Sequence, residues 1–129
     1  MKLINLITAV TLMSISIHSY AGDSLTGEQI KKLFSNKTCD IEKVDTNNEN
    51  KKHLKAFTAA DGSRLLYIPW KDKTKERKWW VEGNKYCGSH PKRGDYCRDI
   101  VDAGNGAYHA LNEGEHLRTF SNFRDGNQL

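Results

Sequence analysis

The strongest hydrophobic run lies at the start of the chain, in residues 1–21. One lysine, Lys2, precedes a short apolar stretch, which ends before the small residues Ser19 and Ala21. A charged start, a short apolar core and small residues at this spacing are typical of a cleaved secretory signal peptide. The pattern predicts cleavage near Ala21/Gly22 and a mature protein in the periplasm or outside the cell. An uncleaved membrane anchor is the less favoured alternative, because the run is short for a bilayer span.

Helical spacing follows directly after this segment. Ile30, Leu33 and Phe34 fall on one face, which is the stripe that a short amphipathic helix buries. Thr26 stands three residues before Gln29, as in a capping box at a helix start. We therefore predict one short N-terminal helix that ends near residue 36.

The pattern then changes to short segments rich in aromatic and aliphatic residues, separated by turn residues. Such segments are typical of strands in an antiparallel sheet. The pair Asp61-Gly62 suits a two-residue hairpin turn with positive φ angles. The candidate strands are 38–44, 54–60, 64–69, 77–82, 85–88, 96–102, 107–112 and 117–123.

Seven or eight strands with such short connections predict a mainly β fold. An up-and-down antiparallel barrel is favoured, because closure removes the sheet edges on which an open meander aggregates. A two-sheet sandwich is the alternative. Residues 22–129 have the length of one small domain, so we expect a single β-barrel domain after the signal peptide.

Alternation within the strand 77–82 places two tryptophans on opposite faces. Trp79 shares a face with Val81, and Trp80 shares the other face with Glu82. Only one face of the strand can be buried. We predict that one tryptophan anchors the interior, while the other covers an end or lines a groove.

The charge of the chain is mildly positive. Lys and Arg number 20 against 16 Asp and Glu, a net charge of +4, and loss of Lys2 leaves about +3. Basic residues cluster at 51–52, 71–78 and 92–93, where solvated turns are favoured over an anionic or acidic partner. We expect no nucleic-acid binding, because no recognised binding motif is present. We also expect no transmembrane segment after signal cleavage.

Three cysteines in an oxidising compartment allow one intramolecular disulfide. Cys87 and Cys97 flank a stretch with one proline and two glycines, which is typical of a loop between two strands. We predict that these two cysteines form the disulfide and stabilise the domain by about 2 to 3 kcal/mol. Cys39 then remains a thiol, with burial favoured over a reactive or intermolecular role.

Polar residues with catalytic or metal-binding potential form no recognised motif. His109 and His116 can face each other across the last hairpin, but two imidazoles alone are a weak metal signal. Ordinary half-exposed histidines are favoured instead. We predict no catalytic residue, no metal site and no cofactor, and therefore a protein that is not an enzyme.

Several short motifs carry a resemblance when they are taken in chain order. They are the Leu-Thr-Gly-Glu-Gln-Ile start at 25–30, the tryptophan strand at 78–82, the cysteine pair, Gly104-Asn105-Gly106 and the terminal Gly126-Asn127. The set resembles a family of small exported bacterial proteins of unknown function. The resemblance implies a lipocalin-like or avidin-like barrel in the periplasm, and it supplies neither a ligand nor catalytic residues.

Two classes of function remain. The favoured one is a binding module for a small, partly apolar ligand. Aromatic side chains of the protein would contact the apolar part of the ligand, and lysine or arginine side chains would bind an anionic group on it. These rings can instead serve only to fill the barrel. The second class is a protein-interaction factor, such as an inhibitor, an immunity-like protein or an envelope stress protein, that acts through basic loops. The candidate ligand-binding residues are Tyr67, Trp70, Trp79, Trp80, Tyr108, Arg77 and Lys78.

Overall fold

The computed structural model describes residues 23–44 and 52–129. The predicted signal peptide and its cleavage point lie outside the described residues. One α-helix, one 3-10 turn and eight strands occupy the described part of the chain. They are α1 (Gly27–Phe34), β1 (Lys37–Lys43), β2 (Lys52–Thr58), β3 (Ser63–Ile68), η1 (Pro69–Lys71), β4 (Lys73–Glu82), β5 (Lys85–Gly88), β6 (Tyr96–Gly104), β7 (Ala107–Asn112) and β8 (Glu115–Asp125).

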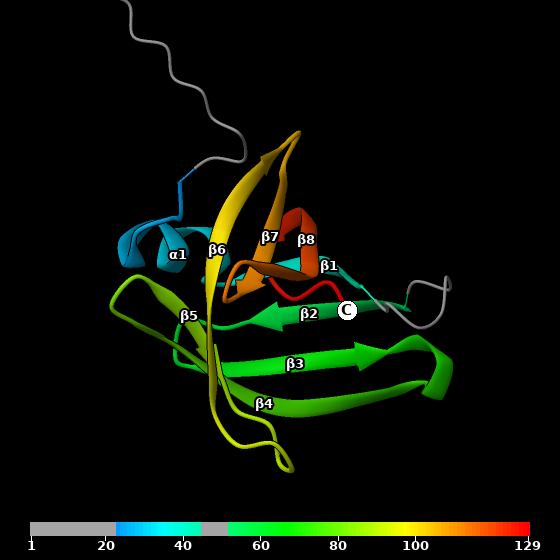
Figure 1. Ribbon diagram of the computed structural model, residues 1–129. Helices are drawn as coiled ribbons and strands as arrows, with labels where there is room; N and C mark the ends of the chain where they lie inside the picture. Colours follow the sequence, from blue (N-terminus) through cyan, green and yellow to red (C-terminus); the bar gives the residue numbers. More distant parts are fainter. Residues whose placement is uncertain (1–22, 45–51) are drawn as a thin grey trace, which may run out of the picture.

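The strands form a closed antiparallel barrel in chain order (Figure 1). Each strand pairs with the next along the chain, and β8 closes the barrel by pairing with β1, where Ile41 lies opposite Phe120. The predicted up-and-down barrel is confirmed, and the sandwich alternative is wrong. Closure satisfies the backbone groups of the first and last strands, which an open meander would leave as edges.

Two local features differ from the sequence-based expectations. Strand β4 begins at Lys73 and not at residue 77, and its lysine-rich first half pairs with β3, with Thr74 opposite Tyr67. The connection from Thr58 to Ser63 spans four residues, and only Gly62 among them has a positive φ angle. Asp61-Gly62 is therefore a turn, as predicted, but not a two-residue hairpin.

Helix α1 closes one end of the barrel. The predicted capping box is present, since Gln29 N donates to Thr26 Oγ1 and Thr26 N donates to Gln29 Oε1. Ile30 and Phe34 are fully buried. The Phe34 ring packs against four aromatic rings of the barrel, those of Trp79, Tyr86, Phe120 and Phe123.

A glycine is required where α1 begins. A Cβ atom on Gly27 would lie only 2.2 Å from the carbonyl oxygen of Gly83, in the β4–β5 turn. The amide of Gly27 also donates to Asn84 Oδ1 at 2.8 Å in the same turn. The start of the helix therefore packs directly against the Gly83-Asn84 turn, and this contact holds the helix at the end of the barrel.

Trp79 is the interior tryptophan. It is 5% exposed, stacks on Tyr86 and donates from Nε1 to the carbonyl oxygen of Ala59 at 2.7 Å. Trp80 lies on the outer face opposite Cys87 and is half-buried. The predicted division of the two tryptophans between interior and surface is confirmed.

Cys87 and Cys97 form the disulfide, as predicted, at directly paired positions of β5 and β6. Cys39 is the free cysteine and is buried on the inner face of β1. Burial is the main cause that raises the pKa of the Cys39 thiol, to about 12. The thiolate, which is the reactive form, is therefore scarce at neutral pH.

We expect Cys39 in the native protein to resist alkylation by iodoacetamide at pH 8, and to react once the chain is unfolded. Intact mass spectrometry of samples labelled with and without denaturant measures this directly. Denatured protein labelled after reduction is the control, because all three cysteines then react. Rapid labelling of the folded, non-reduced protein would contradict the buried placement.

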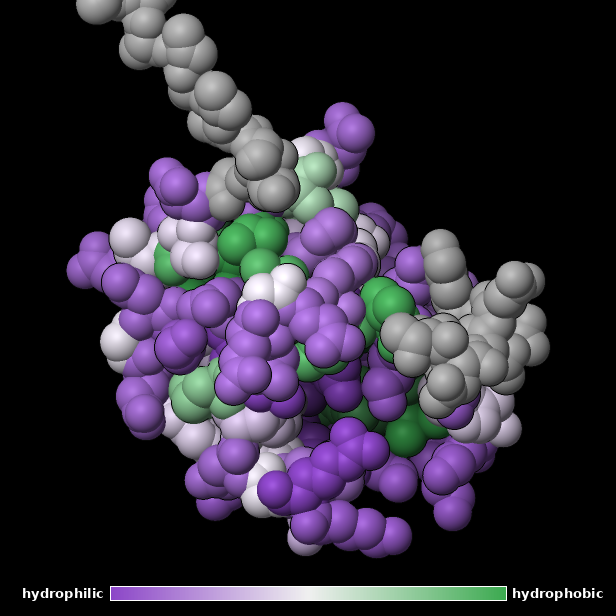
Figure 2. All heavy atoms as spheres, in the orientation of Figure 1, coloured by the Kyte–Doolittle hydropathy of each residue, from purple (hydrophilic) through white to green (hydrophobic). Residues whose placement is uncertain are grey.

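The face of the molecule seen in Figure 2 is largely hydrophilic, and hydrophobic atoms show mainly in recesses between polar side chains. Among the described residues, no helix has the length and hydropathy needed to cross a bilayer.

Candidate functional site

Four strands each place an arginine on the inner face of the barrel. Arg77 of β4, paired with Arg64, lines a separate surface groove, and the other three arginines lie on β3, β6 and β8. Side chains project to alternate faces along a strand, so residues two apart share a face. In β3, β6 and β8 the arginine stands two positions before a residue of the hydrophobic core or packed against it. The three pairs are Arg64 with Leu66, Arg98 with Ile100 and Arg118 with Phe120.

Arg64 is the most deeply placed of the three. Its side chain is 3% exposed, and its titratable neighbours include Tyr86, Tyr96 and Cys39. Among the described residues, neither its Nε nor its Nη2 makes a hydrogen bond of good geometry. The Tyr86 hydroxyl is near enough to raise the pKa of Arg64 by hydrogen bonding, but its alignment with the guanidinium is poor. A buried guanidinium with two unpaired donor nitrogens is costly, and it calls for a ligand or another explanation.

The groups around Arg64 do not neutralise its charge. The pKa of Cys39 is raised to about 12, and burial also raises the pKa of Tyr86 above its usual value. Both groups are therefore uncharged at neutral pH. The positive charge of Arg64 is therefore buried in the barrel, and none of these neighbours is a carboxylate that could balance it.

The other two arginines, Arg98 and Arg118, are partly buried. Burial first, and repulsion from Arg64 second, lower the pKa of Arg118. The guanidinium of Arg98 stands 5.0 Å from the centre of the Tyr96 ring, and its Nη1 donates to the carbonyl oxygen of Cys97 at 2.9 Å. Arg98 also contributes to the lowered pKa of Arg118, so the three cations share one electrostatic environment.

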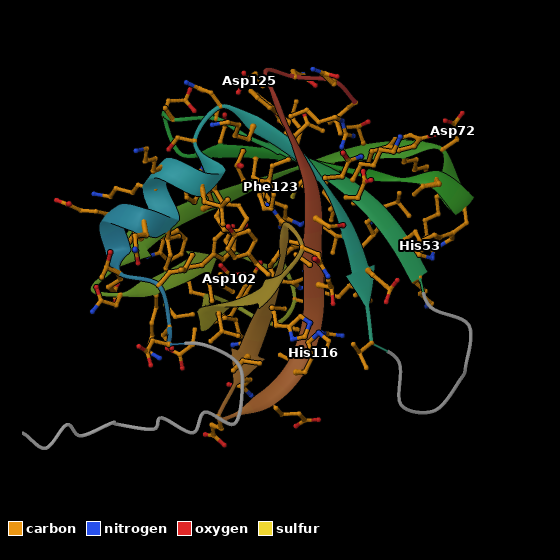
Figure 3. The ribbon with its side chains drawn as sticks, turned by 90° about the horizontal axis from the view of Figure 1, so that it is seen from above. His53, Asp72, Asp102, His116, Phe123 and Asp125 are labelled. Atoms are coloured by element: carbon orange, nitrogen blue, oxygen red, sulfur yellow. A yellow bond between two sulfur atoms is a disulfide. The ribbon has the colours of Figure 1, made fainter. Side chains whose placement is uncertain are left out.

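A cavity of about 620 Å³ opens in front of these residues. It lies toward the barrel end away from α1, the end at which Figure 3 shows His53 and Asp72. Its walls combine aromatic rings with basic side chains, and Asp95 is the acid among the described lining residues. The lining residues are Lys43, Val44, Tyr86, His90, Arg93, Asp95, Tyr96, Cys97, Arg98, Ala110, Leu117, Arg118 and Phe120.

The loop at the mouth of the cavity is internally hydrogen-bonded. His90 Nδ1 accepts from the amides of Lys92 and Arg93, and the backbones of His90 and Gly94 bond to each other in both directions. Burial, followed by the charge of Arg93, lowers the pKa of His90. The imidazole is therefore mostly neutral at pH 7, and the cationic character of the mouth comes from its lysine and arginines.

The seven candidate residues from the sequence do not meet in this cavity. Arg77, Lys78, Trp79 and Trp80 line a separate, open surface groove of about 670 Å³, together with Pro91 and other residues. These four are brought together, although Trp79 contributes little surface because it is almost wholly buried.

The remaining three lie elsewhere. Tyr67 is on the outer face of β3, where its hydroxyl donates to Asp72 Oδ1 at 2.9 Å. Trp70 is 52% exposed in η1, with the ammonium of Lys52 above its ring at 5.6 Å. Tyr108 is on the inner face of β7 and packs edge-on against Phe123.

The sequence-based reasoning missed the buried arginines and the tyrosines beside them. That reasoning selected aromatic residues and basic residues in turns. The charge at the cavity comes instead from arginines on the inner faces of strands. A signal was present, because an arginine two positions before a core-packed residue recurs in four of the eight strands, with Arg77 before Trp79 in β4 as the fourth case. Alternation alone places such an arginine on the buried face.

His109 and His116 do face each other, as predicted, on the outer face of the β7–β8 hairpin. Their ring centroids are 3.7 Å apart with an interplanar angle of 19°, and His116 Nε2 also lies 3.0 Å from Thr119 Oγ1. In the described ranges, no group of three or more His, Cys, Asp or Glu residues is placed to hold a metal ion.

No family model, curated protein or solved structure matches this chain. The resemblance to small exported bacterial proteins therefore stays a hypothesis, and the cavity is the feature of the structure that bears on function.

Proposed function

We propose that this chain is an exported, non-catalytic binding protein whose barrel holds a small, partly apolar, anionic ligand. The observation that carries the proposal is the cationic cavity wall, in which Arg98 and Arg118 line the cavity and Arg64 is buried next to the lining residue Tyr86. Burying an uncompensated charge costs several kcal/mol. A bound anion, held through Arg118 and the neighbouring cations, offsets that cost in the complex.

The cavity walls support the apolar part of the ligand. Tyr86, Tyr96 and Phe120 present rings to the cavity, and Arg98 is held over the Tyr96 ring. Aromatic rings can bury the apolar part of a ligand while a guanidinium binds its anionic group. Such a site combines apolar burial with charge-assisted hydrogen bonding. A volume of about 620 Å³ lies within the range of small-molecule sites.

The scaffold favours a preformed site. The Cys87–Cys97 disulfide ties the two strands that flank the mouth loop, and α1 plugs the opposite end. A closed barrel with these constraints loses little further conformational freedom when a ligand enters.

We expect the anionic aromatic dye 8-anilino-1-naphthalenesulfonate to bind the native protein at one site with enhanced fluorescence. Replacing Leu117 at the cavity wall by tryptophan fills the entrance and should weaken binding at least tenfold. Leu111→Trp is the matched control, since Leu111 lies on the outer face of β7 and outside the cavity lining. Fluorescence titration measures both variants, and equal binding by both would contradict a site in the barrel.

The alternative function, a protein-interaction factor, is favoured by a basic surface along η1 and β4. Repulsion from Lys71 is the main cause that lowers the pKa of Lys75, and Arg77, Lys73 and Lys92 add to it. Exposed Trp70 adjoins this surface. If the native protein binds neither this dye nor other small aromatic anions, this alternative becomes the better hypothesis.

A further inference from the structure

The charge inside the barrel constrains the charge of the ligand. Arg64, Arg98 and Arg118 occupy the inner faces of β3, β6 and β8, no two of which are neighbours, and closure of the barrel brings them together. Arg98, Arg118 and Tyr86 line the same cavity, and Arg64 is buried next to Tyr86. The charges of Arg64 and Arg98 also lower the pKa of Arg118, so the three guanidinium groups are treated as one cluster.

The protein compensates this cluster only weakly. Tyr86 and Tyr96 are the tyrosines next to the arginines, and burial raises the pKa of Tyr86, so its hydroxyl is neutral at physiological pH. Asp95, the acid among the described residues that line the cavity, is exposed, so water screens its charge from the buried arginines. A ligand with a single negative charge would leave most of the cluster unbalanced.

We propose that the head group of the ligand carries two negative charges, as a phosphate monoester or a phosphonate of a ring-bearing compound does. This inference rests on the proposed binding function. A planar guanidinium presents a rigid fork of donors that matches phosphate oxygens two at a time. Arg118 and Arg98 line the cavity and contact the head group, while Arg64, buried next to Tyr86, supplies the third charge.

Phenyl phosphate and phenyl sulfate form a matched pair of probes. They share the ring and a tetrahedral anionic group, but at pH 8 the phosphate ester carries nearly two charges and the sulfate ester carries one. We expect isothermal titration calorimetry at low salt to show phenyl phosphate binding at least tenfold more tightly than phenyl sulfate.

Arginine variants link this preference to the cluster. Arg118→Gln should reduce the phosphate-over-sulfate ratio to less than threefold. Lys55→Gln is the control, because it removes one positive charge from the exposed outer face of β2 and should leave the ratio unchanged. If thermal unfolding shows that Arg118→Gln is not folded, Arg98→Gln serves as the second variant with the same expected loss.

The outcomes separate this inference from the function on which it rests. Equal affinity for the two probes, or a preference that survives Arg118→Gln, overturns the doubly charged head group. Binding of the naphthalenesulfonate dye without binding of phenyl phosphate also overturns it, while the binding function stands. If the dye and both phenyl probes fail to bind, the proposed function itself fails.

Discussion

Replacing Trp79 by alanine is expected to lower the free energy of unfolding by about 3 to 5 kcal/mol. Trp79 is almost wholly buried, stacks on Tyr86, packs against Phe34 and donates a hydrogen bond to Ala59. Truncation therefore removes a large apolar surface and leaves a cavity between the helix plug and the barrel wall. For a domain of this size the loss is a large share of the total stability.

Trp80→Ala is the matched control for this prediction. Trp80 is adjacent in sequence but lies half-buried on the outer face of the same strand, opposite Cys87. Its truncation should cost far less. Urea unfolding followed by circular dichroism measures both variants, and small, equal losses would contradict the assignment of Trp79 as the interior anchor.

Replacing Arg64 by methionine is expected to stabilise the ligand-free protein by about 1 to 4 kcal/mol. Methionine has a similar length and removes a buried charge whose Nε and Nη2 make no hydrogen bond of good geometry among the described residues. The same change should weaken phenyl phosphate binding at least tenfold, because the cluster loses its deepest charge. Opposite effects on stability and on binding are expected of a residue retained for function.

Arg124→Met controls for the loss of an arginine as such. Arg124 is on β8, outside the cavity, where Nη2 lies 3.2 Å from Asp40 Oδ1. Removing a partly exposed ion pair of this kind should change stability by no more than about 1 kcal/mol and leave binding intact. A destabilising Arg64→Met substitution would show that the Arg64 guanidinium contributes to folding, and would remove one support for an anion site.

Local structure was largely predictable from particular residues. Thr26 and Gln29 predicted the start of α1, and the capping box is there because this pair satisfies backbone amides within one turn. The disulfide between Cys87 and Cys97 followed from the loop residues between them. These features depend on neighbours a few residues away, which is the range over which sequence patterns carry information.

The first half of β4 was missed because its sequence gives no hydrophobic signal. Lys73 to Glu76 contains no apolar residue, so no alternation marks it as a strand. Its pairing with β3, with Lys75 opposite Leu66, comes from the backbone ladder that continues along the neighbouring strand. Tertiary context can override local propensity in this way.

The sequence by itself determined that Trp79 and Trp80 face opposite ways, that Cys87 and Cys97 can pair and that short strands follow one helix. Only the tertiary structure decided which tryptophan is inside, because that choice depends on where Phe34 of the helix plug packs. The meeting of Arg64, Arg98 and Arg118 was also decided there. Their strands are brought together by barrel closure and strand register, which depend on residues far apart in the chain. The residue pattern within a single strand therefore does not predict that these arginines meet.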